Sequence, residues 1–281
     1  LTAAAIAASG LGGAHAPAAT GRQKTVLIRG GLIVNAHSQA QADVLIVGDK
    51  ITQLGANLRP PNRATRIIEA RGLQLLPGGI DPHVHAMPGF ADDFETASRA
   101  ALAGGITTMG VMAFMTKAEN LPQLLQRLSS AVRAQSIADV MLHPSPEGRT
   151  PSAEELPHLA AAGYTSLKLF SIDVDFSQAF FQYIEVLEAA KALGILPLLH
   201  CEDQNVTKAA LRKLVAQGKT SIEFYEESRR VAAEVLSTQH AMALCELTGC
   251  PVYIVHLSSA RALRACEGGQ ARGLPVFLEG R

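Results

Sequence analysis

The stretch LLPGGIDPHVH, residues 75–85, places two histidines two positions apart directly after an apolar run and a pair of glycines. Such a run is typical of a short buried strand, in which successive side chains point to opposite faces of the sheet. His83 and His85 therefore share one face, where two neutral imidazoles can bind one metal ion. Asp81, two residues earlier, could hold the imidazoles in position by hydrogen bonding. The motif alone leaves open the alternative of two polar histidines at a strand end with no metal.

The composition is that of a globular chain with a sizeable core. Among 281 residues, 48% are hydrophobic and 18% are charged, which excludes an intrinsically disordered protein. The 25 basic and 25 acidic residues balance and form no long blocks, so we expect no nucleic-acid partner. The cysteines show no CxxC spacing and are too few for a disulfide framework, so we expect reduced thiols. They are Cys201, Cys245, Cys250 and Cys266.

Residues 1–24 differ from the rest of the chain. The first twenty, LTAAAIAASGLGGAHAPAAT, are rich in Ala and Gly, and they contain AHA, a small-x-small pattern of the signal-peptidase type. The segment is interpreted either as the back half of an export leader, which would place the protein outside the cytoplasm, or as a disordered upstream tail. It is too short and too rich in small residues for a transmembrane helix, and we expect no membrane partner.

Residues 25–75 predict a small β-sandwich-type domain. The segments TVLIRGG, LIVNA, ADVLIV and KITQLG alternate apolar and polar residues between Gly and Asn breaks, as hairpin-connected strands do. ATRIIEARG and LQLLPGG continue the pattern and lead into the DPHVH strand. We expect this domain to be incomplete, with its C-terminal strands absent from the chain.

From residue 76 to residue 281, strands alternate with helices, which predicts an α/β fold with a parallel sheet. After the DPHVH strand, further strands are expected at 106–114, 138–146, 166–170, 195–203, 252–259 and 274–280. Helices are expected at 92–103, 121–135, 152–163, 178–194, 220–249 and 259–273. Seven such strands predict a TIM-like (β/α)8 barrel that is truncated before strand eight.

Reactive residues of such barrels lie at the C-terminal ends of the strands. The first strand ends at His83 and His85, the fifth at His200 and the sixth at His256. One histidine at such a position is more often a hydrogen-bonded core residue, but four at the ends of three strands favour metal ligands. His143 also lies near a strand end and is assigned no ligand role. The same holds for His15, His37, His158 and His240.

Lys168 is the unusual residue of the apolar strand SLKLF, residues 166–170. A buried lysine is costly unless it is paired or neutral. Desolvation lowers its pKa, and an uncharged amine can react with carbon dioxide to give an anionic carbamate, whose two oxygens could bridge two cations. The alternative is a strand-end lysine whose amine reaches solvent. The surrounding histidines favour the bridge.

The motifs DPHVH, SLKLF, LLHCED and VYIVHLSS, preceded by LIRGGLIV and LLPGGID, resemble the cyclic amidohydrolases of the amidohydrolase superfamily. The segment ADDFETASRAALAGGITT is most similar to dihydropyrimidinases and D-hydantoinases. The resemblance extends from about Thr25 to Arg281, and its motifs are specific because they recur in order on successive strands.

The resemblance implies two divalent metal ions, with zinc as the expected metal. His83 and His85 would bind the more buried ion, His200 and His256 would bind the second, and carboxylated Lys168 would bridge them. The ions would activate a bridging hydroxide that opens a dihydropyrimidine or hydantoin ring to an N-carbamoyl amino acid. The implied partners are a small cyclic amide and, in the full-length protein, copies of the chain in a homodimer or homotetramer. The family location is cytoplasmic.

Three departures from the family pattern limit the substrate assignment. Family members carry an Asp at the end of strand eight, whereas this chain ends at Arg281 after the seventh predicted strand, which predicts a fragment or a truncated product. Dihydropyrimidinases place a substrate-contacting Tyr five residues after the bridging lysine, where this chain has Asp173. Dihydroorotases carry an Arg where this chain has Met87, which argues against that activity. No substrate-binding residue is assigned.

Other interpretations stay open. Allantoinase-like or other cyclic amidohydrolase activity would depend on loops that the sequence does not resolve. A non-catalytic dihydropyrimidinase-related protein or an inactive fragment is favoured by the missing strand eight, and opposed by the retention of all five ligands. An unrelated barrel enzyme with one metal would be favoured if Lys168 is unmodified.

Overall fold

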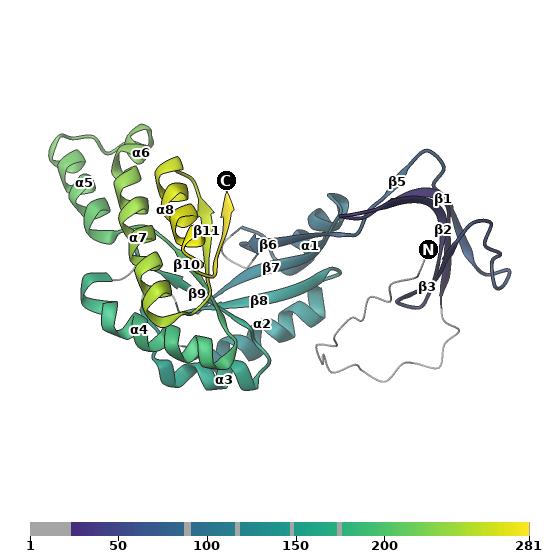
Figure 1. The fold of residues 1–281 in the computed structure, drawn as a ribbon, viewed down its shortest axis with the longest axis horizontal. Coiled ribbons are helices and arrows are strands. Elements are labelled where there is room, and N and C mark those ends of the chain that lie inside the picture. Colours follow the sequence, from purple (N-terminus) through teal and green to yellow (C-terminus); the bar gives the residue numbers. More distant parts are fainter. Residues whose placement is uncertain (1–23, 87–90, 116–118, 147–148, 173–175, 281) are drawn as a thin grey trace. The chain divides into compact units, whose positions relative to one another are not determined.

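The computed structural model describes residues 24–86, 91–115, 119–146, 149–172 and 176–280 (Figure 1). The chain divides after Pro77 into two compact units, which are considered separately. The leader-like segment predicted at 1–24 lies outside the described residues apart from Lys24. Within the described ranges, none of the helices has both the length and the apolar character needed to cross a bilayer.

The unit that ends at Pro77 is built on antiparallel hairpins. In the described residues it is a single five-stranded sheet in the order β3-β2-β1-β4, with β5 also paired to β1. β4 and β5 run parallel to β1. The strands are β1 (Thr25–Val34), β2 (Gln39–Val47), β3 (Lys50–Gly55), β4 (Arg66–Glu69) and β5 (Gln74–Leu75).

Two segments that the sequence pattern separates, TVLIRGG and LIVNA, form the single strand β1. Its pairing with β2 shifts between Ile28 and Gly31, which marks a bulge. Gly30 lies in this bulge with φ 63°, a left-handed conformation that favours glycine. The two glycines therefore bend the strand instead of ending it.

The unit that begins at Gly78 is an α/β structure, as predicted, and its paired strands run parallel. One sheet has the order β6-β7-β8 and the other has the order β12-β11-β10-β9. β8 and β9 lie beside each other, so spatial neighbours follow the sequence (Figure 1). Among the described residues β12 does not pair with β6, so a closed barrel is not formed. The strands are β6 (Gly79–Val84), β7 (Ile106–Phe114), β8 (Asp139–Ser145), β9 (Ser166–Phe170), β10 (Leu196–His200), β11 (Val252–Leu257) and β12 (Val276–Gly280).

Helices connect successive strands, and local side chains fix where several of them begin. The Asp93 carboxylate caps the first helix, the Asn120–Gln123 capping box begins the second, and Ser259 caps the last. The helices are α1 (Phe94–Ala103), α2 (Leu121–Gln135), α3 (Leu156–Ala161), α4 (Phe176–Leu193), α5 (Gln204–Ala216), α6 (Tyr225–Ser228), α7 (Val231–Thr248) and α8 (Ala260–Ala271). Short 3-10 turns precede α3 and α6, at Ala153–Glu155 and Ile222–Phe224.

The prediction of one helical region from Thr220 to Gly249 is wrong in extent. Helix α5 precedes that region and was not predicted; the Asp203 carboxylate starts it by accepting the Val206 N–H at 2.9 Å. The region itself is broken between α6 and α7, where Arg229 and Arg230 leave the helical conformation.

Strand residues of this unit alternate between two apolar clusters. The larger core packs helices against strands and includes Leu199 and Ile254. Their neighbours in sequence, Leu198 and Val255, point to the opposite face of the sheet and join Met112 in a smaller cluster. Lys168 is paired in register with Leu198. Directly paired residues of a sheet point to the same face, so Lys168 lies on the face opposite the main core.

Candidate metal centre

His83 and His85 come together at the end of β6. Their Nε2 atoms lie 3.1 Å apart and their ring centroids 5.1 Å apart. Two ligands at ~2.1 Å from one tetrahedral ion are separated by ~3.4 Å, so the observed spacing is close to that of two imidazoles on one ion. The alternation of side chains along the strand places both rings on one face, as the sequence predicts.

Glu279, at the end of β12, contacts the outer nitrogen of His83. Its Oε1 accepts a hydrogen bond from Nδ1 of His83, and the same oxygen accepts the backbone N–H of His256 at 2.9 Å. Oε2 accepts the Tyr253 hydroxyl at 3.2 Å. Burial alone would raise the pKa of Glu279, but the hydrogen bonds from His83 and His256 lower it below its usual range, so the side chain is a carboxylate.

Because a carboxylate can only accept, His83 must carry its proton on Nδ1, which leaves the Nε2 lone pair facing His85. Burial lowers the pKa of His83 despite this contact, so the ring is neutral. Asp81, the sequence-predicted support, accepts the backbone N–H of His83 at 3.1 Å. The carboxylate on the imidazole itself is Glu279, which the sequence prediction missed.

His200 and His256 form a second pair. Their rings lie 4.5 Å apart between centroids in an edge-on arrangement, and the His256 ring is 5.4 Å from that of His83. The backbone of His256 has φ 40°, a left-handed conformation that residues other than glycine rarely adopt. The pairing of β11 with β12 shifts at this point, between Ile254 and Leu257. Burial lowers the pKa of His256 to about 3, so this imidazole is also neutral.

Lys168 has no exposed surface, and its Nζ has no hydrogen-bond partner among the described residues. The amine lies 4.9 Å from the centroid of the Phe170 ring. Burial lowers its pKa to about 7, and the nearby carboxylate of Glu279 only partly opposes this. Burial is the main cause of the low pKa values of His83 and His256, and the neighbouring Lys168 adds to both. The Phe170 ring links the lysine to the second pair, because its centroid lies 5.2 Å from that of His200.

These side chains fit a two-metal site only with a contribution from the lysine. In the part of the chain that the structure describes, no three His, Cys, Asp or Glu side chains are grouped so that they could hold an ion. The histidines supply two pairs of imidazoles, and the buried Lys168 amine, which has no hydrogen-bond partner among the described residues, contacts the Phe170 ring, which in turn lies 5.2 Å from the His200 ring. A carbamate on that amine would add two anionic oxygens, the missing ligands of both subsites.

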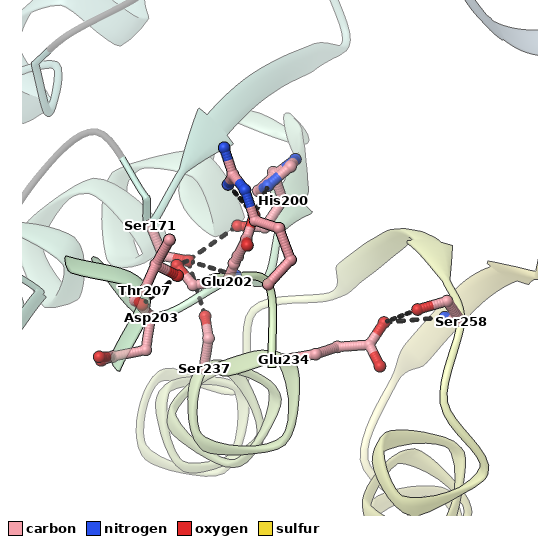
Figure 2. Close-up of polar contacts among 9 residues, drawn as sticks. Ser171, His200, Glu202, Asp203, Thr207, Glu234, Ser237 and Ser258 are labelled. Carbon is pink, nitrogen blue, oxygen red and sulfur yellow. Dashed lines mark hydrogen bonds and ion pairs between the residues drawn. The ribbon is translucent and has the colours of Figure 1, made fainter. Parts of the chain in front are cut away.

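A polar network that sequence reasoning did not identify holds the end of β10 (Figure 2). Ser171 Oγ donates to the His200 carbonyl at 2.8 Å, accepts the Glu202 N–H at 2.9 Å, and lies 2.7 Å from Ser237 Oγ. The Glu202 carboxylate is 3.2 Å from His200 Nε2 and accepts from Arg229 at 2.8 Å. This network joins the ends of β9 and β10 and positions the His200 ring.

His143, to which the sequence analysis assigns no ligand role, contacts a neighbouring strand. It is buried on β8, its Nδ1 lies 2.7 Å from Ser166 Oγ, and burial lowers its pKa to about 4. Asp173 and Met87, the positions that distinguish related activities, lie outside the described residues.

No family model matches the chain. The chain is 33% identical to a D-hydantoinase of Geobacillus stearothermophilus, over 91% of this chain and 55% of that protein. It is 33% identical to an allantoinase of Solibacter usitatus, over 90% of this chain and 56% of that protein. A solved D-hydantoinase (dihydropyrimidinase) from Thermus sp. superimposes with a TM-score of 0.83 at 34% identity, covering 91% of this chain and 57% of that chain.

The chain is an α/β structure that is similar in fold and sequence to cyclic amidohydrolases. It is related to D-hydantoinases and dihydropyrimidinases at about 30% identity over about 90% of its length. The chain spans little more than half the length of these relatives.

Proposed function

We propose that this protein is a metal-dependent hydrolase that opens a cyclic amide of the dihydropyrimidine or hydantoin type to an N-carbamoyl amino acid. The Lys168 amine carries the proposal. It is fully buried, has no hydrogen-bond partner among the described residues, and lies 4.9 Å from the Phe170 ring, whose centroid is 5.2 Å from that of His200. A core that needed only packing would place an apolar side chain there, because an unsatisfied buried amine is destabilising.

The environment of Lys168 favours carboxylation. With a pKa of about 7, a large fraction of the amine is uncharged at neutral pH. Its nitrogen lone pair forms a bond to the carbon of carbon dioxide while one C=O π pair moves onto oxygen. One proton passes from the nitrogen to water, and the product is a carbamate with one negative charge. The product would present two oxygens in place of an amine without a partner.

In the proposed site the two histidine pairs hold separate ions. His83 and His85 would bind one divalent cation, His200 and His256 the other, with zinc as the expected metal. Bound cations would supply a Lewis acid for the amide carbonyl and an activated water. His83 and His256 are already neutral, so no proton has to leave these rings before they bind.

The proposal extends to a closed barrel, which the described strands by themselves do not form. The parallel strands β6 to β12 follow one another in space, and the five candidate ligands lie at or near the C-terminal ends of β6, β9, β10 and β11. Reactive groups of a (β/α)8 barrel lie at the C-terminal ends of its strands, so this order of strands and this placement of the ligands support a barrel.

Allantoinase activity is the second candidate. The chain is as similar to an allantoinase as to a D-hydantoinase, at 33% identity to each. Both interpretations require the same metal ligands and hydrolyse a ring amide, so they differ only in the ring that is accepted.

A substrate panel tests the proposal. The purified chain, loaded with zinc in bicarbonate, would be given dihydrouracil, hydantoin or allantoin, with ring-opened products separated by chromatography. We expect opening of at least one ring, its loss in Lys168→Ala, and its retention in Lys208→Ala, which removes an exposed lysine on α5. Opening that persists in Lys168→Ala, or no opening by a chain that carries two metals, would contradict the proposal.

A further inference from the structure

Glu279 connects elements that the sequence separates by almost two hundred residues. One oxygen accepts both the Nδ1 proton of His83 on β6 and the backbone N–H of His256 on β11, while the other accepts the Tyr253 hydroxyl. The carboxylate is largely buried, with 18% of its side chain exposed. Each of these three donors is therefore tied to a single group at the end of β12.

The contact with His83 determines which ring nitrogen can bind a cation. A carboxylate on Nδ1 fixes the tautomer with a free lone pair on Nε2, and it limits rotation of the ring. That lone pair points toward His85, whose Nε2 is 3.1 Å away. Without the carboxylate, the proton could move to Nε2 and block the position where the two rings meet.

The contact with His256 supports a strained backbone. A left-handed conformation at a non-glycine residue persists only when neighbouring groups hold it. The His256 N–H is held by Glu279 at 2.9 Å, within the irregular part of the β11–β12 pairing. This hydrogen bond directs the His256 ring toward His200, 4.5 Å away.

We propose that Glu279 is a positioning residue that orients one ligand of each metal subsite, His83 through its ring and His256 through its backbone. The inference rests on the proposed function, because it assigns a role toward the same cations. Carboxylates that hold metal-bound histidines typically contribute 10–100-fold to metal affinity. Loss of the Glu279 charge is therefore expected to weaken binding at both subsites.

The test measures Co²⁺ binding to the full chain by chelator competition and by the visible absorption of the bound ion. Glu279→Gln keeps the size of the side chain but removes its charge. We expect a ~10–100-fold loss of Co²⁺ affinity and a changed absorption spectrum. Glu234→Gln is the matched control, since Glu234 accepts the N–H groups of Ser258 and Ser259 directly after the same strand and contacts no histidine within the described residues (Figure 2).

Wild-type Co²⁺ affinity and spectrum in Glu279→Gln would overturn the inference. An equal loss of affinity in Glu234→Gln would also overturn it, because the effect would then come from the stability of the loop alone. Tyr253→Phe removes the hydroxyl that donates to Oε2 of Glu279, and it gives a second test if Glu279→Gln does not fold. We expect a smaller loss of Co²⁺ affinity in this variant. An unchanged affinity would count against the inference. If the wild-type chain binds no Co²⁺, the proposed metal site itself fails, and the inference fails with it.

Discussion

The Nε2 atoms of His83 and His85 lie 3.1 Å apart, with the proton of His83 held on its other nitrogen by Glu279. The pair is thus arranged as two ligands of one ion. We expect His83→Ala and His85→Ala each to lose one metal ion per chain. His143→Gln is the control: it removes a buried histidine that contacts Ser166, and metal content should be unchanged. Elemental analysis of the purified variants decides, and full metal content in His85→Ala would contradict the assignment.

Ser171→Ala should destabilise the α/β unit. The hydroxyl serves the His200 carbonyl and the Glu202 N–H, and its loss leaves these groups without that partner in a buried place. We expect the free energy of unfolding to fall by ~1–3 kcal/mol in urea denaturation. Ser130→Ala, which removes an exposed hydroxyl on α2, should change it by less than ~0.5 kcal/mol. Equal stabilities of the two variants would show that the network contributes little.

Asp43 should make the β-sheet unit sensitive to acid. The Gly30 N–H at 2.8 Å, together with the Leu58 N–H, holds the pKa of this buried carboxyl below its usual value. A carboxyl whose pKa is lower in the folded than in the unfolded state stabilises the fold above its unfolded pKa, and this stabilisation is lost as the pH falls through the folded pKa. The protection factors of β1 and β2 amides in hydrogen exchange, measured relative to the intrinsic rate at each pH, should therefore fall below about pH 4.

In Asp43→Asn this acid dependence should be weaker, and protection at neutral pH should already be reduced. Asp49→Asn, in the exposed turn before β3, serves as the control and should keep the wild-type profile. An identical pH profile in the Asp43 variant would assign the acid sensitivity to other groups.

The cysteines should resist alkylation in the folded chain. All four thiols are buried, and burial raises the pKa of Cys201 to about 12 and those of Cys250 and Cys266 to about 11. Since the thiolate is the reactive form, iodoacetamide at pH 8 should label none of them within the time that labels the urea-unfolded chain completely. Rapid labelling of one native thiol, detected by mass spectrometry, would show that the segment around that cysteine opens locally.

The sequence predicts the order of strands and helices because periodicity is a local property. It places His83, His200 and His256 at the ends of three strands and Lys168 within a fourth, since parallel strands share one direction. Glu279 was missed because its role depends on how β12 lies relative to β6 and β11, which no local pattern records. The hydrogen bonds of Ser171 likewise join residues 29 and 66 positions away.

Helix α5 was also missed, although a signal was present. Asp203 followed by a mostly polar segment with Leu and Val at helical spacing is a helix start that could have been recognised. The single strand β1 depends on Gly30, where a bulge and a turn have the same sequence signature.

The most direct test of the metal site is the modification of Lys168. The chain would be loaded with zinc in ¹³C-labelled bicarbonate, with metal content and the carbamate carbon signal measured on the same sample. We expect two metal ions and one carbamate per chain, and loss of the carbamate with at least one ion in Lys168→Ala but not in Lys208→Ala. Two ions per chain in Lys168→Ala, or a loaded wild-type protein without a carbamate signal, would contradict the account.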